Sequence, residues 1–136
     1  MLSKHPERCK YPHGHTRTVE VVVAGESLDA NGMLVDFKAL KLALQDHIER
    51  YDHSMAVNSS DPLLPTLQKM YPADAVVVFE DMEPTTEAIA REIFDFVSQT
   101  LDQGFQEAHY QIHPGQVRLE RVRVWETPSS WAEYGV

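Results

Sequence analysis

The sequence is poor in cysteine and contains no long apolar run. Its single cysteine, Cys9, has no partner for an internal disulfide bond, and a free thiol of this kind is typical of a reducing compartment. No apolar segment approaches the roughly 18 residues of a membrane helix, and the polar residues 1–8 lack the apolar core of a signal peptide. We therefore expect a cytoplasmic protein without a membrane partner.

Basic residues are also scarce. The chain has 12 Lys and Arg against 21 Asp and Glu, which gives a formal net charge of −9. Nucleic-acid binding needs a concentrated basic surface, so we expect no nucleic-acid partner. The length of 136 residues, with 43% hydrophobic content and no internal repeat, predicts a single domain spanning residues 1–136.

A cysteine and two histidines stand close together between Cys9 and His15, in the order Cys-Lys-Tyr-Pro-His-Gly-His. If His13 and His15 enter the strand that follows, their side chains share a face, so both imidazoles can reach one metal ion. Imidazole suits zinc, and a catalytic zinc normally has three protein ligands. The spacing therefore predicts part of a zinc site, whose third ligand has to come from elsewhere.

Hydrophobic periodicity predicts the secondary structure of the first half. Residues 16–25 are rich in β-branched side chains and indicate a strand. Asn31-Gly32 predicts a hairpin, with residues 32–35 returning as a second strand. Asp36 is a good N-cap for an amphipathic helix over 36–50, whose apolar stripe is Phe37, Leu40, Leu44, Ile48 and Tyr51.

The second half repeats this alternation of helix and strand. Residues 63–70 suggest a short helix and residues 75–79 a buried strand. Pro84-Thr85-Thr86-Glu87 opens a long helix that Gly104 can end, while residues 105–116 are ambiguous. Residues 117–126 are expected to form a final strand. The order predicts an α+β fold, an antiparallel β-sheet with two main helices on one face, whose long edge strands pair between subunits of a homo-oligomer.

Most of the polar motifs also have an ordinary structural interpretation. A His-x-His pattern at the start of a strand is more often exposed to solvent than bound to metal. Asp52 and His53 follow the first helix, where they could simply cap its C-terminus. The other histidines in the body of the chain are expected to be ordinary surface or loop residues: His47, His109 and His113.

Glu126 is the most informative single residue. Strand alternation places it beside Val122 and Val124 on the face that should meet the core. An unpaired carboxylate is costly in such a place. We therefore expect Glu126 to have a partner, and the donor groups of a ligand could supply it.

These motifs, taken in order, resemble one family. The matching segments are Cys-x3-His-Gly-His, Asn31-Gly32-Met33, Val35-Asp36-Phe37, Leu40-Lys41, Asp52-His53, Pro84-Thr85-Thr86-Glu87 and Val124-Trp125-Glu126-Thr127. The chain resembles the 6-pyruvoyltetrahydropterin synthase and 6-carboxytetrahydropterin synthase family, zinc enzymes of the tunnelling fold. The resemblance extends from Cys9 to about Glu126.

The resemblance implies a role for each matching residue. His13 and His15 would be zinc ligands, and Cys9 would be the catalytic thiol, which abstracts a proton. Asp52 and His53 would complete a proton relay. The resemblance also implies pterin contacts. Glu126 would bind the ring nitrogens, and Thr86 and Glu87 at the start of the second long helix would contact the pterin beside it.

One departure from the family concerns the start of the chain. The family begins with a strand that ends in the first histidine ligand, and no such strand precedes His13 here. We expect the chain to start late relative to the family, and so to lack one strand and one metal ligand. His5 could substitute. The alternatives are a metal completed by solvent or by a neighbouring subunit, a weakly held metal, or an apo protein.

The activity that the resemblance implies is a zinc-dependent lyase reaction on 7,8-dihydroneopterin triphosphate. The favoured product is 6-carboxy-5,6,7,8-tetrahydropterin, a precursor of 7-deazapurines such as queuosine. Formation of 6-pyruvoyltetrahydropterin by triphosphate elimination is one alternative. A non-catalytic pterin-binding relative with an incomplete zinc site is another.

Overall fold

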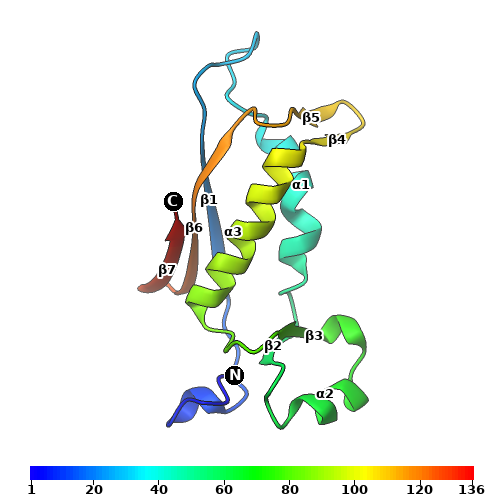
Figure 1. Cartoon of the computed structure of the whole chain (residues 1–136), viewed down its shortest axis with the longest axis vertical. Coiled ribbons are helices and arrows are strands. Elements are labelled where there is room, and N and C mark those ends of the chain that lie inside the picture. The colour runs from blue at the N-terminus through cyan, green and yellow to red at the C-terminus, as the bar shows by residue number, and fades with distance from the viewer.

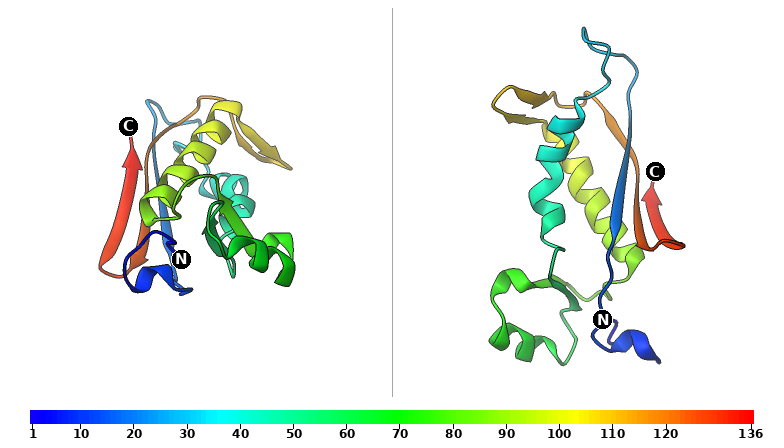
Figure 2. Two further views of the ribbon diagram at one scale, coloured as in Figure 1. Left: turned by 60° about the horizontal axis from the view of Figure 1, so that its bottom comes forward. Right: turned by 180° about the vertical axis from the view of Figure 1, so that it is seen from behind.

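The computed structural model describes all 136 residues and places a three-stranded antiparallel sheet beside two long helices (Figure 1). The sheet contains β1 (Thr18–Ala24), β6 (Arg118–Thr127) and β7 (Ser130–Gly135) in the order β1-β6-β7. Helix α3 (Thr86–Gln103) packs on β6 and β7, and α1 (Phe37–Glu49) lies on the same side of the sheet, next to α3 (Figure 2). The predicted α+β architecture is confirmed.

The core lies between α3 and the inner face of the sheet. Strand β1 pairs with β6 so that Val19 faces Val124 and Val21 faces Val122. The fully buried side chains here are Ile89, Ile93, Val97, Leu101, Val122 and Val124. Burial of each such side chain stabilises the fold by about 1.5–3 kcal/mol.

Polar caps set the first residue of each long helix. The Asp36 carboxylate accepts a hydrogen bond from the Lys38 amide (2.8 Å) at the start of α1. The Thr85 hydroxyl accepts one from the Ala88 amide (3.1 Å) at the start of α3. The N-cap predicted at Asp36 is therefore confirmed, and Thr85 caps the helix that Pro84-Thr85-Thr86-Glu87 was predicted to open. Gly104, with a φ of 79°, ends α3 as expected.

The remaining elements are short. Strands β2 (Met55–Asn58) and β3 (Val76–Phe79) form a parallel pair, and α2 (Leu64–Met70) lies between them in the sequence. Strands β4 (Phe105–Glu107) and β5 (Tyr110–Ile112) form a hairpin after α3. Two single 3-10 turns complete the fold, Arg8–Lys10 and Ala73–Ala75.

Two local predictions are wrong. Residues 32–35 do not form a strand, because the Asp29 carboxylate accepts hydrogen bonds from the amides of Asn31 and Met33 and closes a turn there, and β1 pairs with β6 instead. Phe37 does not join the apolar stripe of α1, since 85% of it is exposed at the first turn. Phe37 thus points to solvent, while Val35 and Ala39 on either side of it are buried in the core.

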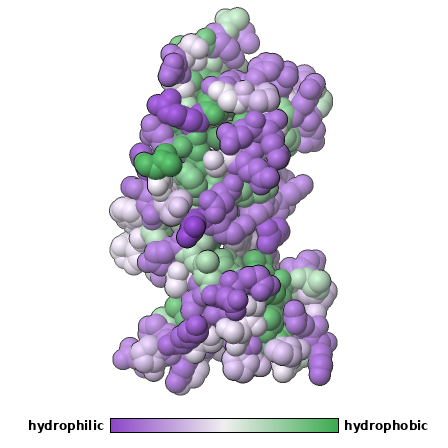
Figure 3. All heavy atoms as spheres, viewed as in Figure 1, coloured by the Kyte–Doolittle hydropathy of each residue, from purple (hydrophilic) through white to green (hydrophobic).

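The face shown in Figure 3 is mostly hydrophilic, with hydrophobic side chains visible in small groups. None of the helices combines the length and the apolar character needed to cross a membrane.

Candidate active site

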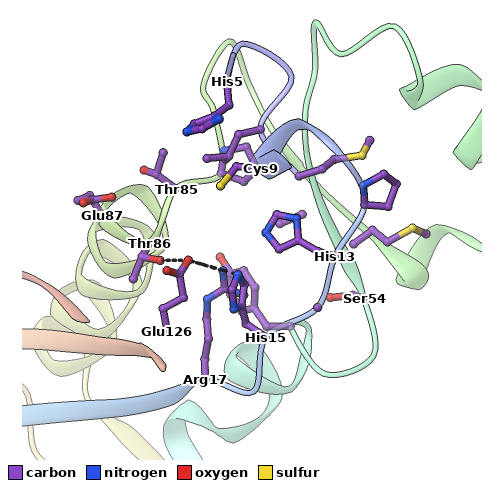
Figure 4. Close-up of a pocket in the computed structure, with 18 of the residues that line it drawn as sticks. His5, Cys9, His13, His15, Arg17, Ser54, Thr85, Thr86, Glu87 and Glu126 are labelled. Carbon is purple, nitrogen blue, oxygen red and sulfur yellow. Dashed lines mark hydrogen bonds and ion pairs between the residues drawn. The ribbon is translucent and has the colours of Figure 1, made fainter. Parts of the chain in front are cut away.

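A cavity of about 730 Å³ opens where the N-terminal segment, the end of α1, the start of α3 and the end of β6 meet (Figure 4). This volume falls within the range of small-molecule sites. Its lining includes seven of the eight predicted site residues, all except Asp52: Cys9, His13, His15, His53, Thr86, Glu87 and Glu126. Chain folding therefore gathers residues more than 100 positions apart.

Glu126 lies at one wall of the cavity. Its side chain points toward the first turn of α3, on the side that alternation from Val124 predicts, although the register of β6 with β7 shifts between Trp125 and Thr127. The Thr86 hydroxyl donates a hydrogen bond to Glu126 Oε1 (2.9 Å), and His15 Nε2 lies 3.5 Å from the same oxygen. Thr86 is the first residue of α3, where the helix dipole also favours a negative charge. The carboxylate is thus held in position and still faces the cavity.

His13 and His15 lie in the extended segment just before β1, which begins at Thr18, rather than in the strand itself. Their rings are edge to face, with centroids 4.9 Å apart. His13 Nδ1 lies 2.7 Å from the Tyr11 carbonyl oxygen, which leaves Nε2 for another partner. Burial lowers the pKa of His15 although Glu126 opposes the shift, so the neutral imidazole is favoured at neutral pH.

The donor set for a metal is incomplete in the chain. No three His, Cys, Asp or Glu side chains come together in a group that could hold a metal ion. His5 lines the same cavity, but its Nδ1 accepts a hydrogen bond from the Glu7 amide (3.0 Å) and it does not complete a three-residue group. The two imidazoles fit as part of a zinc site, and the third protein ligand of a typical catalytic site is not supplied by this arrangement.

The N-terminal segment brings Cys9 to the cavity. The Leu2 amide donates a hydrogen bond to the Cys9 carbonyl (2.8 Å), which folds the segment back on itself. The Ser3 hydroxyl donates to Glu83 Oε1 (2.6 Å) and ties the segment to the loop before α3. Cys9 lies within the turn Arg8–Lys10, and Figure 4 shows its sulfur between His5 and His13.

Asp52 and His53 form a pair at the rim. His53 Nδ1 lies 2.8 Å from Asp52 Oδ1, and His53, but not Asp52, lines the cavity. The His53 side chain is 94% exposed. Its φ of 52° lies in the left-handed region, which is uncommon for residues other than glycine. This backbone conformation turns the chain sharply between α1 and β2.

Sequence reasoning missed two residues of the cavity wall, Arg17 and Tyr51. Arg17 Nη2 lies 3.8 Å from Glu126 Oε1. The Tyr51 hydroxyl donates a hydrogen bond to Glu92 Oε2 (2.6 Å) on α3. Arg17 lies two residues after His15, as His15 lies two residues after His13. In an extended segment this spacing indicates that the Arg17 side chain faces the same side as the two imidazoles. The contact of Tyr51 spans 41 positions and has no local signal.

The expectation that His47 is an ordinary surface residue is wrong. Its side chain is 12% exposed, its Nε2 lies 2.7 Å from Glu92 Oε1, and its ring stacks on Phe96 at 3.7 Å between centroids. Glu92 thus contacts both His47 and Tyr51 of the C-terminal end of α1. The two helices are joined beside the cavity through this carboxylate.

Comparison with protein families gives a match over nearly the whole chain. The sequence model described as 6-pyruvoyl tetrahydropterin synthase matches residues 1–135. A protein of Aquifex aeolicus named 6-carboxy-5,6,7,8-tetrahydropterin synthase is 32% identical over 133 residues, which cover 96% of this chain and 78% of the relative. The protein of the same name from Bacillus subtilis is 32% identical over 126 residues, covering 93% and 69%.

Solved structures agree with the fold. An uncharacterized protein from Wolinella succinogenes superposes with a TM-score of 0.67 at 25% identity, covering 93% of this chain and 80% of that one. The 6-pyruvoyl tetrahydropterin synthase of Plasmodium vivax superposes with a TM-score of 0.63 at 18% identity, covering 91% and 82%. The arrangement of sheet and helices is therefore the tunnelling fold of those proteins.

Proposed function

Because the chain belongs to the 6-pyruvoyl tetrahydropterin synthase family, we propose that it is a lyase that converts 7,8-dihydroneopterin triphosphate to 6-carboxy-5,6,7,8-tetrahydropterin. One water molecule is consumed, and acetaldehyde and triphosphate are the other products. The names of the relatives from Aquifex aeolicus and Bacillus subtilis support this choice of product. The reaction would serve the synthesis of 7-deazapurines such as queuosine, and we place it in the cytoplasm.

The observation that carries the proposal is the position of Glu126. Its carboxylate is fixed by the Thr86 hydroxyl at the wall of a cavity of suitable size for a pterin. A carboxylate only accepts hydrogen bonds, and the pyrimidinone edge of a pterin presents adjacent N–H donors. Glu126 would bind that edge through charge-assisted hydrogen bonds, with Thr86 and Glu87 beside it at the start of α3.

Cys9 and the Asp52–His53 pair are the candidate proton-transfer groups. In the proposed reaction the Cys9 thiolate removes a proton from a side-chain carbon of the substrate, and His53 exchanges protons on the neighbouring part of the side chain. Asp52 Oδ1 lies 2.8 Å from His53 Nδ1 and orients the imidazole. The exposed position of His53 at the rim allows it to exchange its proton with solvent.

Zinc is the proposed cofactor, and His13 and His15 are its proposed ligands in this chain. When bound, zinc would act as a Lewis acid toward the side-chain hydroxyl groups of the substrate. His13 is suited to ligation because its Nδ1 is engaged by the Tyr11 carbonyl, which orients the ring.

A second function is favoured by the incomplete donor set. A non-catalytic pterin-binding protein would need Glu126 and the cavity but no three-ligand metal site. Metal analysis of protein produced with zinc present separates the two. Near-stoichiometric zinc that is lost in His13→Ala and His15→Ala supports the enzyme, whereas zinc-free protein that still binds pterin supports the binding protein.

The product assay tests the proposal directly. Incubation of the protein with 7,8-dihydroneopterin triphosphate, followed by identification of the pterin by mass spectrometry, should give the 6-carboxy compound. Accumulation of 6-pyruvoyltetrahydropterin would assign triphosphate elimination instead. Unchanged substrate in the presence of zinc would remove the catalytic function.

We also propose that the protein is a homo-oligomer, a trimer or a hexamer. Strands β1 and β7 are the two edges of the sheet, and each has one side unpaired within the chain. Unpaired strand edges favour association with another strand.

A further inference from the structure

Arg17 is a cation in the cavity wall that the proposed reaction does not use. It lies two residues after His15 and one before β1 begins, and 26% of its side chain is exposed. Figure 4 shows it reaching from the chain beside His15 toward the end of Glu126. The guanidinium is therefore placed next to the carboxylate that is proposed to hold the ligand.

The hydrogen-bonding capacity of Arg17 is not satisfied within the chain. Its Nε is shielded from solvent and has no acceptor. Its nearest carboxylate oxygen, on Glu126, lies 3.8 Å from Nη2, which is longer than a direct hydrogen bond. A desolvated guanidinium with free donors is costly unless a ligand supplies an acceptor.

The two neighbouring groups have complementary chemistry. Glu126 only accepts hydrogen bonds and Arg17 only donates them. Side by side they match a ring edge on which N–H donors stand next to a carbonyl oxygen. A 2-amino-4-oxopteridine has such an edge, formed by its 2-amino group, N3–H and the 4-oxo group. A 2,4-diaminopteridine offers an amino group where the carbonyl oxygen would be, and an amino group cannot accept from a guanidinium.

We propose that Arg17 is a specificity-determining residue that donates a hydrogen bond to the 4-oxo group of the bound pterin while Glu126 accepts from its N–H groups. The inference rests on the proposed pterin-binding function and adds to it a selection for 4-oxo over 4-amino rings. Arg17 and Glu126 would thus form hydrogen bonds with adjacent atoms of one edge of the pterin ring.

The experiment measures the dissociation constants of pterin and 2,4-diaminopteridine by isothermal titration, for the wild type, Arg17→Met and Arg17→Lys. Arg17→Met removes the donors and keeps an unbranched side chain. Arg17→Lys keeps a cation that can donate. Arg118→Met is the matched control, because Arg118 is exposed and begins β6 at the end opposite Glu126. Thermal unfolding of each variant confirms that it is folded.

The ratio of the two dissociation constants decides the outcome. The wild type and Arg118→Met should bind pterin more tightly than 2,4-diaminopteridine. In Arg17→Met the ratio of the two dissociation constants should fall about tenfold, as expected for the loss of one charged hydrogen bond. Arg17→Lys should recover part of it. An unchanged ratio in Arg17→Met, with both ligands weakened equally, would overturn the inference and leave Arg17 as a simple counter-charge to Glu126. A wild type that binds neither compound would instead overturn the proposed function, and the inference with it.

Discussion

Glu126 both accepts a hydrogen bond from a protein side chain and borders the cavity. Its Oε1 receives the Thr86 hydrogen bond and faces His15 and Arg17, while the side chain still borders the cavity. This single residue could be identified from sequence because strand alternation puts a carboxylate where an apolar side chain is expected. For Arg17 the i, i+2 spacing from His15 indicates the side that it faces, but its contact with Glu126 comes from a distant element and has no local signal.

Glu126→Gln tests the role of the carboxylate. The amide keeps the size of the side chain and an acceptor for Thr86, but it presents an NH2 group to the N–H edge of the ligand. Pterin binding should weaken by about 1.5–3 kcal/mol, the usual value for a hydrogen bond to a charged group. The measurement is isothermal titration with pterin. Unaltered affinity would show that the ring binds elsewhere.

Cys9→Ala tests the proposed base. Cys9 lies on the folded N-terminal segment and has no side-chain partner that the fold needs, so we expect unchanged thermal unfolding and unchanged pterin affinity. Turnover of 7,8-dihydroneopterin triphosphate should fall by about 100-fold or more, the contribution typical of a general base. Turnover at the wild-type rate would exclude the thiol from the mechanism.

The end of α1 is held to α3 by one carboxylate. Glu92 on α3 receives the Tyr51 hydrogen bond (2.6 Å) and lies 2.7 Å from His47 Nε2. Asp52 and His53 follow Tyr51 directly, so this contact also fixes where the proposed proton-transfer pair begins. Burial and the contact with Glu92 both raise the pKa of Tyr51, which keeps its hydroxyl protonated as a donor.

The pH dependence of stability should report on Glu92. Burial acts to raise its pKa, but the contacts with His47 and Tyr51 outweigh burial, so the pKa in the fold is lowered. The ionised group therefore stabilises the fold fully above its unfolded pKa of about 4.3. This stabilisation is lost as the pH falls through the folded-state pKa.

Glu92→Gln should reduce the free energy of unfolding by about 1–3 kcal/mol at neutral pH. The difference from the wild type should shrink as the pH falls below the unfolded-state value of about 4.3 and then through the lowered folded-state pKa of Glu92. Urea unfolding at a series of pH values measures it. A difference that is independent of pH would show that the charge of Glu92 does not contribute.

The N-cap of α3 gives a simpler test. Thr85→Ala removes the acceptor for the Ala88 amide and should lower the free energy of unfolding by about 1 kcal/mol. Thr85→Ser keeps the hydroxyl and is the matched control. Chemical denaturation compares the two. Equal loss in both variants would mean that the methyl group, and not the cap, is responsible.

Elements with strong local patterns could be predicted, and elements that depend on distant pairing could not. The apolar periodicity of α1 and α3 and the β-branched residues of β1 and β6 identify them within two residues of their observed ends. Strand β3 was predicted at residues 75–79, but β7, β2 and the parallel pairing of β2 with β3 were missed because they depend on non-local contacts. The predicted strand at 32–35 is wrong for the same reason, since a local turn signal cannot show which partner β1 takes.

The whole molecule has a sheet with two free edges, β1 and β7. Light scattering coupled to size-exclusion chromatography should give the mass of a trimer or a hexamer of the 15.5 kDa chain. Dilution should shift the protein toward smaller species by mass action. A monomer at all concentrations would contradict the proposed use of the edges.

For the molecule as a whole, the central claim is that the cavity between the N-terminal segment, α3 and β6 binds a pterin through Glu126. A crystal structure of the protein with pterin tests this claim most directly. The account predicts the 2-amino and N3–H groups of the ring within hydrogen-bonding distance of Glu126, with the 4-oxo group toward Arg17. A ring bound outside this cavity, or bound inside it with its N–H edge turned away from Glu126, would contradict the account.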